Sequence, residues 1–219
     1  MKKLENLTRC IEGLRSEGCG EHFAIRFGTA DNYSDLYSGD GVNADTNFDM
    51  ASVTKILCTT TLCLIALDEG KFIVDTPVSE FFPVPEDKKA LTVRYLMTHS
   101  LGFGHKPLNF PEVNYDNVAG YILNIPCEFP VGTETEYCCP AFILLGKILE
   151  KVYGKRLDVL FREKVTETLS LKRTSFGSEK VNVVNSNYSE EDLGTVNDYN
   201  CRHLGGVAGN AGVFPTLMT

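Results

Sequence analysis

Residues 48–67 read Phe-Asp-Met-Ala-Ser-Val-Thr-Lys-Ile-Leu-Cys-Thr-Thr-Thr-Leu-Cys-Leu-Ile-Ala-Leu, and this stretch decides how the rest of the chain is interpreted. Most positions from Ile56 to Leu67 are apolar, and Gly70 is the first residue that favours the end of a helix. A helix that is apolar on all sides is normally buried. The stretch therefore predicts a helix from Ser52 to Gly70 that lies buried at the centre of a domain.

The residues Ser52-Val53-Thr54-Lys55 form a Ser-x-x-Lys pattern that occurs nowhere else in the chain. Residues i and i+3 share one face of a helix, so we expect the Lys55 ammonium to lie beside the Ser52 hydroxyl. Desolvation next to an apolar helix disfavours the charged form of a lysine, which suits it to accept the proton of a serine nucleophile. Backbone N–H groups at a helix N-terminus can stabilise an oxyanion. Spacing alone leaves the alternative open that Ser52 caps the helix and Lys55 is unrelated to it.

The composition is that of an average globular protein: 219 residues, 43% hydrophobic, 10% aromatic and 23% charged. The net charge is −8, and no window clusters Lys and Arg, so we expect neither nucleic acid nor an anionic membrane surface as a partner. Charged residues interrupt any apolar signal segment near the N-terminus, and no stretch approaches the roughly 18 uninterrupted apolar residues of a membrane span. We therefore expect a cytoplasmic protein with no membrane span.

Eight cysteines could form four disulfides in a secreted chain, but without an export signal we expect free thiols that mostly fill the core as small apolar groups. There is no Cys-x-x-Cys pair, and the four histidines do not fall at zinc-finger spacing. The sequence therefore predicts no metal site and no cofactor.

Periodicity predicts the other elements of secondary structure. Apolar residues at three- and four-residue intervals favour a helix over residues 2–17 that ends at Gly18. Residues 23–27 and 35–37 have the pattern of two antiparallel strands joined by a turn. Beyond residue 70 we expect mainly helix and loop, with helices at residues 93–97 and 142–152.

Residues 48–55 resemble the nucleophile segment of the serine β-lactamase-like and penicillin-binding superfamily, in particular its class C, esterase and D-aminopeptidase-like branch. Four further segments resemble stretches of that branch in the same order. Residues 70–78 resemble the turn after the nucleophile helix, and 91–102 its Thr-His-Thr-Ser-Gly stretch. Residues 130–154 resemble the segment that bears its Tyr-x-Asn motif, and 205–214 its Gly-His-Ala-Gly-Leu-Phe stretch.

The resemblance implies an α/β, more narrowly α+β, fold with an antiparallel sheet region and a helical subdomain. Residues 1–219 would then form a single domain, with the helical subdomain inserted after the nucleophile helix at approximately residues 71–200. The implied chemistry is acyl transfer on a small amide or ester, β-lactam-like or peptide-like. Ser52 is implied as nucleophile, Lys55 as proximal base or proton relay, and Tyr137 as the group that moves a proton to and from the leaving atom. How the role of base divides between Lys55 and Tyr137 stays open.

The sequence departs from the family pattern at two substrate-binding positions. Cys139 stands where the Tyr-x-Asn motif has its Asn, which removes an amide that would bond both substrate and lysine. Asn210 stands where the branch often has His. Residues 115–117 match Tyr-x-Asn literally, but they lack the Pro-x-Gly before them and the apolar helix after them, so Tyr115 ranks second. An aromatic residue that merely packs at a helix start is the other interpretation of Tyr137.

The family's third motif, Lys-Thr-Gly or His-Thr-Gly, has no counterpart, because no Thr-Gly dipeptide occurs in the chain. The resemblance then implies that the C-terminal strands are lacking and that the sheet is incomplete, with an unpaired edge. Three hypotheses follow: a serine acyl-hydrolase, a catalytically inactive fragment or penicillin-binding-like module, and a homo-oligomer in which a second copy covers the open edge.

Overall fold

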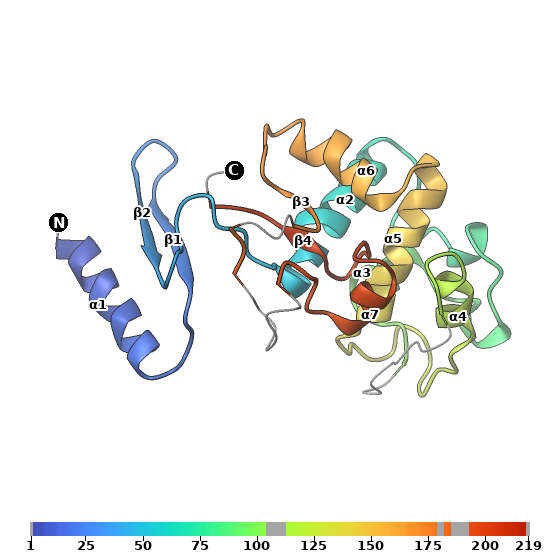
Figure 1. The fold of residues 1–219 in the computed structure, drawn as a ribbon. Helices are drawn as coiled ribbons and strands as arrows, with labels where there is room; N and C mark the ends of the chain where they lie inside the picture. The colour runs from blue at the N-terminus through green and yellow to red at the C-terminus, as the bar shows by residue number, and fades with distance from the viewer. Residues whose placement is uncertain (1, 104–112, 179–181, 185–192, 218–219) are drawn as a thin grey trace.

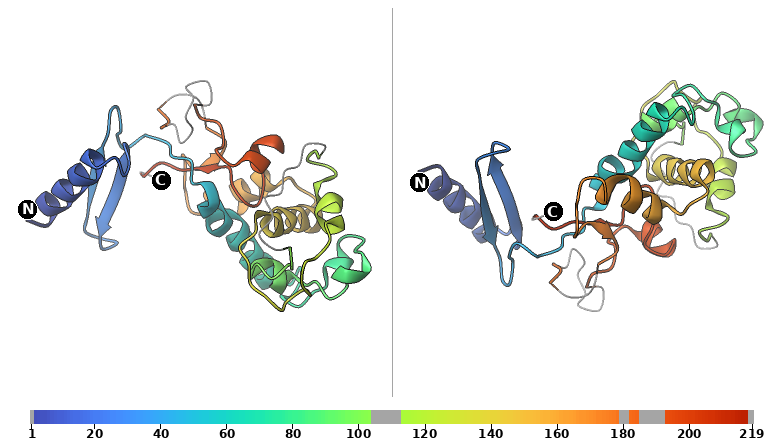
Figure 2. Two further views of the ribbon diagram at one scale, coloured as in Figure 1. Left: turned by 90° about the horizontal axis from the view of Figure 1, so that it is seen from below. Right: turned by 90° about the horizontal axis from the view of Figure 1, so that it is seen from above.

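The computed structural model describes residues 2–103, 113–178, 182–184 and 193–217 (Figure 1). It has a larger helical body and, to one side of it, a smaller unit made of α1 (Lys2–Ser16), β1 (Phe23–Gly28) and β2 (Tyr33–Ser38). Figure 2 shows the same separation from above and below. The helix predicted over residues 2–17 and the two predicted strands are therefore confirmed, with both strands longer than expected.

The strands β1 and β2 form an antiparallel hairpin in which Phe23 pairs with Ser38 and Gly28 with Tyr33. Across the hairpin, Arg26 donates two hydrogen bonds of 2.8 Å to Asp35 and lies 4.0 Å above the Tyr33 ring. Helix α1 packs against β2. Among the described residues, β1 and β2 form ladder hydrogen bonds only with each other.

The helix that begins at Ser52 changes its winding along its length. A 3₁₀ turn, η1 (Ala51–Val53), leads into a π-helical stretch, η2 (Lys55–Thr60), which continues as α2 (Thr61–Asp68). Cys58, Leu62 and Cys63 are fully buried on one face, so these two cysteines fill the core as predicted, whereas Cys10 and Cys19 are exposed. Residues 51–68 are also long and apolar enough to cross a membrane by length and composition alone, a property that core helices share.

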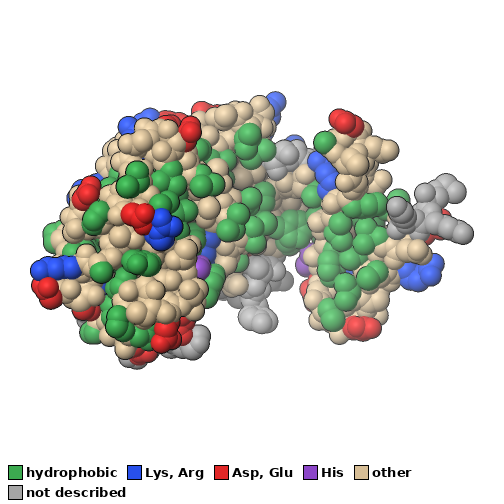
Figure 3. All heavy atoms as spheres, turned by 180° about the vertical axis from the view of Figure 1, so that it is seen from behind, with side chains coloured by type: hydrophobic (Ala, Val, Ile, Leu, Met, Phe, Trp, Pro, Cys, Tyr) green, Lys and Arg blue, Asp and Glu red, His purple; other side chains and the backbone are tan. Residues whose placement is uncertain are grey.

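The prediction that this helix is buried on all sides is wrong. Val53, Ile56 and Leu64 are 47%, 62% and 57% exposed, because neighbouring elements pack against one side of the helix only. Seen from behind, hydrophobic side chains reach the surface of both the body and the hairpin (Figure 3). Such exposed apolar area is energetically unfavourable in water.

Helix α5 (Cys139–Tyr153) forms the centre of the helical body, and nine of its residues are buried. It begins three residues before the predicted helix, with Pro140 in its first turn, where proline is well tolerated. It packs against η2, α2, α3 (Val93–Met97), α4 (Val118–Asn124) and α6 (Leu157–Phe161). The predicted helix at residues 93–97 coincides with α3. Around these lie the short elements η3 (Val78–Glu80), η4 (Glu86–Lys88), η5 (Arg162–Thr166) and α7 (Tyr199–His203).

A second small sheet positions the start of the helix that contains Ser52. The strands β3 (Ser175–Phe176) and β4 (Val213–Phe214) pair antiparallel. The chain that enters η1 runs beside β4, because Met50 N–H donates to the Val213 carbonyl at 3.1 Å and Phe48 N–H donates to that of Pro215 at 3.2 Å. The mixed helix and strand architecture confirms the predicted fold class, whereas the division at residues 71–200 stays a prediction.

Replacing Gly209 by alanine is expected to destabilise the body. A Cβ there would lie 2.0 Å from the Phe142 carbonyl oxygen and 3.1 Å from the Gly146 nitrogen, so the loop and α5 would have to separate. We expect Gly209→Ala to lower the free energy of unfolding in urea by about 3 kcal/mol. Gly120→Ala on α4 is the control, since its Cβ meets nothing within 4 Å, and it should not lower stability. Equal urea midpoints for the two variants would contradict the close approach.

Candidate active site

Ser52 lies in a turn whose backbone is held from two sides. Ala51, immediately before it, has a φ of 43°, a left-handed conformation that is unfavourable for alanine. The Asp49 carboxylate accepts the Ala51 N–H at 2.8 Å and, through its other oxygen, the Asn197 N–H at 2.6 Å. These bonds fix the strained turn and present Ser52 at the start of the helix.

Lys55 is buried, with 3% of its surface exposed, and its amine has three hydrogen-bond partners. The Nζ atom donates to Ser52 Oγ at 3.0 Å, to the Asn210 carbonyl oxygen at 3.0 Å and to Cys139 Sγ at 3.5 Å. An ammonium group has three N–H donors, so these partners use all of them. The expected approach of Lys55 to Ser52 is confirmed, and the interpretation of the two residues as unrelated is wrong.

Tyr137 comes to Ser52 from the segment that precedes α5. Its hydroxyl donates to Ser52 Oγ at 2.7 Å, and its ring lies 5.0 Å from Lys55 Nζ. The side chain is 57% exposed, and in addition to packing against His99 it hydrogen-bonds Ser52. Ser52 Oγ thus accepts hydrogen bonds from two groups that can each take up or release a proton.

The competing Tyr115 lies elsewhere in the body. Its hydroxyl hydrogen-bonds Glu150 of α5, and Lys147 Nζ lies 3.7 Å from its ring centroid. Burial raises the pKa of Tyr115, and the hydrogen bond to Glu150 raises it further. The contacts of Tyr115 are therefore with α5 and not with Ser52.

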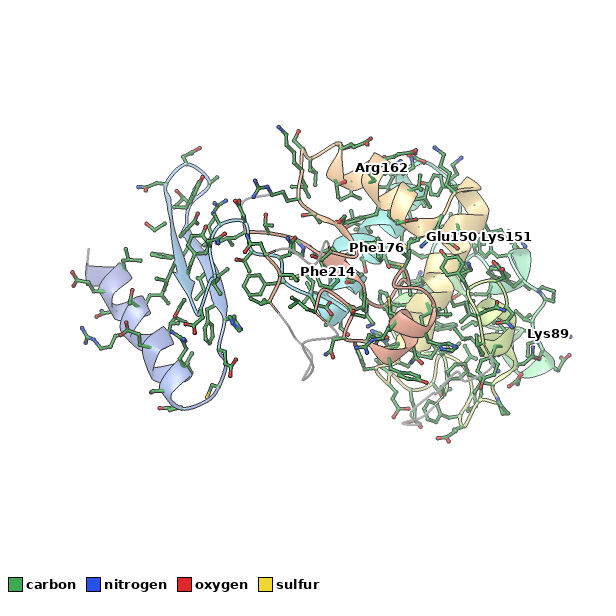
Figure 4. The ribbon with its side chains drawn as sticks, viewed as in Figure 1. Lys89, Glu150, Lys151, Arg162, Phe176 and Phe214 are labelled. Carbon is green, nitrogen blue, oxygen red and sulfur yellow. The ribbon has the colours of Figure 1, made fainter. Side chains whose placement is uncertain are left out.

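A cavity of about 300 Å³ opens beside Ser52 and Lys55. Val53 and Ile56 form one wall, and the rings of His99, Tyr137 and Phe142 complete the lining. A larger cavity of about 590 Å³ lies between α6, η5 and β3, near Arg162 and Phe176 in Figure 4. None of the predicted site residues lines the larger cavity, so the smaller one is the candidate active site.

The two predicted substrate-binding residues are placed differently. Cys139, at the start of α5, is partly buried and directs its thiol to Lys55. Asn210 is fully buried and reaches Lys55 through its backbone carbonyl. Its side-chain amide has no hydrogen-bond partner among the described residues, and it does not line the cavity beside Ser52. A role of either residue in binding substrate stays a prediction.

His99 lines the same cavity, although it is not among the predicted site residues. Its ring centroid lies 4.7 Å from that of Tyr137, and its Nδ1 accepts the Cys138 N–H at 3.2 Å. Burial lowers the pKa of His99, and the charge of Lys55 acts in the same direction. The available signal was its place in the Thr-His-Ser stretch at residues 98–100. In the described part of the chain, no cluster of three or more His, Cys, Asp or Glu side chains could hold a metal ion.

Comparison with known protein families gives a match over most of the chain. The sequence matches the profile of the family described as beta-lactamase over residues 21–217, which is nearly the whole chain. The chain belongs to the beta-lactamase family. The superfamily that the motifs suggested is therefore confirmed.

The sequences of individual relatives match this member of the beta-lactamase family over part of their length. A beta-lactamase from Pseudomonas fluorescens is 29% identical over 135 residues, which cover 61% of this chain and 37% of that protein. An N-acetylmuramyl-L-alanine amidase from Bacillus subtilis is 29% identical over 147 residues, 60% of this chain and 33% of the amidase. The chain thus spans about a third of the length of these curated relatives.

The solved structures show the same fold. The octameric penicillin-binding protein homologue from Pyrococcus abyssi superposes with a TM-score of 0.78 at 20% sequence identity. The superposition covers 98% of this chain and 54% of that one. The fold expected from the resemblance is confirmed, and this chain corresponds to about half of the homologue's length.

Thr59 is expected to stabilise the loop that brings Asn210 to Lys55. Its hydroxyl is fully buried and donates to the Gly209 carbonyl at 2.7 Å. Thr59→Val removes this donor at nearly constant volume and should lower the free energy of unfolding by about 2 kcal/mol. Thr61→Val is the control, because Thr61 bonds only within its own helix, to Ile56, and its loss should cost less than about 0.5 kcal/mol. Urea denaturation of both variants tests the difference, and equal effects would rule out a special role for Thr59.

Proposed function

We propose that this chain is a serine acyl-hydrolase in which Ser52 forms an acyl-enzyme with an amide or ester. The observation that carries the proposal is the pair of hydrogen bonds on Ser52 Oγ, from Lys55 Nζ at 3.0 Å and Tyr137 Oη at 2.7 Å. A serine hydroxyl is a weak nucleophile until an adjacent base takes its proton. Two such groups flank this one, and a cavity opens beside all three.

In the proposed reaction, the Ser52 oxygen forms a bond to the substrate carbonyl carbon while its proton passes to Lys55 or Tyr137. The bond from that carbon to the leaving nitrogen or oxygen then breaks, and the leaving atom takes up the proton. Water attacks the acyl-enzyme in the second half and restores the Ser52 hydroxyl. Either Lys55 as a neutral amine or Tyr137 as a phenolate beside the Lys55 ammonium can begin the cycle.

The proposed substrates are β-lactam-like or peptide-like amides and esters. The names of a beta-lactamase and an amidase among the relatives support this class. The cavity wall of Val53, Ile56 and Phe142 would contact an apolar part of such a substrate. Cys139 in place of an amide favours a second candidate: a module that binds such molecules without turnover.

Labelling with a fluorophosphonate probe, read by mass spectrometry, tests the nucleophile. We expect one adduct on Ser52 of the folded protein and none on Ser52→Ala. Tyr137→Phe should slow labelling about 100-fold, since it removes a proton-transfer group. Tyr115→Phe is the matched control and should label at the rate of the unmodified chain, because Tyr115 bonds Glu150. Folded protein with no adduct on Ser52 would contradict the proposal.

The thiol of Cys139 is expected to be a poor substitute for an amide. Cys139→Asn would offer Lys55 an oxygen acceptor and offer the substrate carbonyl an N–H donor. One added hydrogen bond to a charged group should speed acylation by a β-lactam about tenfold. Cys139→Ser is the control, because a hydroxyl of similar size cannot reach both partners. If both variants acylate at the original rate, position 139 does not contact the substrate.

A further inference from the structure

His99 holds three consecutive residues around Tyr137. Its backbone carbonyl accepts the Glu136 N–H at 2.9 Å, and its ring Nδ1 accepts the Cys138 N–H at 3.2 Å. Between these two bonds lies Tyr137, whose ring is 4.7 Å from the imidazole and tilted 38° to it. On its other side the imidazole contacts the Phe142 ring of α5 at 4.9 Å.

The backbone at His99 explains how one residue can make both bonds. Its φ is 57°, in the left-handed region, where histidine is found more often than most residues. This turn directs the carbonyl and the side chain toward the same incoming segment. The next residue continues the contact, because the Ser100 carbonyl accepts the Gly132 N–H at 2.9 Å and its hydroxyl lies 3.2 Å from that of Thr135.

We propose that His99 is the positioning residue of this site: its neutral imidazole, bonded to Cys138 N–H and packed on the Tyr137 ring, sets the Tyr137 hydroxyl on Ser52. The proposal rests on the proposed function for its catalytic consequence. The Tyr137 ring packs on the His99 imidazole, and the Tyr137 side chain is more than half exposed. Without His99, its hydroxyl would be free to leave Ser52.

The charge state of His99 matters because of what faces it. Lys55 of η2 presents a positive charge, the N–H of Cys138 points at Nδ1, and Tyr137, Cys139 and Phe142 surround the site. A proton on Nδ1 would place a donor against the Cys138 N–H and a second cation near Lys55. Because the pKa of His99 is lowered below its ordinary value, the neutral form holds Tyr137 at neutral pH, and this hold is lost as the pH falls through that lowered pKa.

The test compares His99→Asn with His99→Leu. Asparagine tolerates the left-handed backbone and can present its side-chain oxygen to the Cys138 N–H, but it does not titrate. Leucine offers no acceptor. We expect fluorophosphonate labelling of Ser52 at pH 7.5 to stay within about threefold in His99→Asn and to fall about 100-fold in His99→Leu.

The pH profile separates positioning from a merely structural role. The unmodified chain should lose labelling rate on acidification with a midpoint below pH 6.5, whereas His99→Asn should lack this step. His203→Asn is the control, because His203 bonds the Val113 carbonyl and does not line the cavity, and it should retain the step. An unchanged rate in His99→Leu, or an acidic step that persists in His99→Asn, would overturn the proposal.

Nuclear magnetic resonance gives an answer that does not depend on activity. The Cys138 amide and the Tyr137 ring signals should shift together with the titration of the His99 ring, and both should stay flat in His99→Asn. If no probe labels Ser52, the proposed acyl transfer fails while this titration still decides the positioning. If neither signal follows His99, the positioning is refuted even when Ser52 labels normally.

Discussion

The buried amine of Lys55 is the group around which this structure is organised. Taking a charged or strongly polar amine out of water is unfavourable unless hydrogen bonds replace the lost solvent. Here the replacements come from Ser52 on the same helix and from two distant parts of the chain, Cys139 at the start of α5 and the Asn210 carbonyl. Satisfying one amine therefore requires the helix, the central α5 and the loop before β4 to meet at one point. Two features allow these segments to approach. Thr59 hydrogen-bonds Gly209, and Gly209, which has no side chain, lies directly against α5.

The local parts of the fold and site could be predicted from the sequence, and the tertiary parts could not. The i, i+3 spacing of Ser52 and Lys55 predicted their contact, and the periodicity of apolar residues predicted α1, α3 and the hairpin. The two-residue strands β3 and β4 are too short to show alternation. The exposed flank at Ile56 and Leu64 depends on which elements pack nearby, which composition does not encode. The neighbouring motifs favoured Tyr137 over Tyr115 as the tyrosine of the site. The structure gives the physical reason, because the Tyr115 hydroxyl bonds Glu150 and the Tyr137 hydroxyl bonds Ser52.

The polar groups described for the candidate site all lie in the helical body, whereas one apolar flank of its helix is exposed. Ser52 hydrogen-bonds Lys55 and Tyr137, and Tyr137 packs on His99, so contacts within the body link these four residues. Beside them, Val53 and Ile56 are exposed, and the hairpin of β1 and β2 pairs with no other described strand. The solved homologue matches nearly all of this chain over about half of its own length. The proposed catalytic groups are thus held by contacts within the helical body, whereas the described elements leave part of the apolar surface beside them exposed.

The winding of the π-helical stretch from Lys55 to Thr60 determines which way Ser52 and Lys55 face relative to α2. A π turn holds more residues than an α turn, so the ladder between Lys55 and α2 contains an extra residue relative to regular winding. Deleting one residue while the stretch rewinds as α would leave Ser52 and Lys55 on nearly the same side of the helix, because the wider π turn is what absorbs the extra residue. Rewinding as α at the same length would instead rotate Ser52 and Lys55 by about 100° relative to the buried face of α2 and turn the amine away from α5. The winding of this one turn, in addition to its side chains, therefore links the folding of this chain to its chemistry.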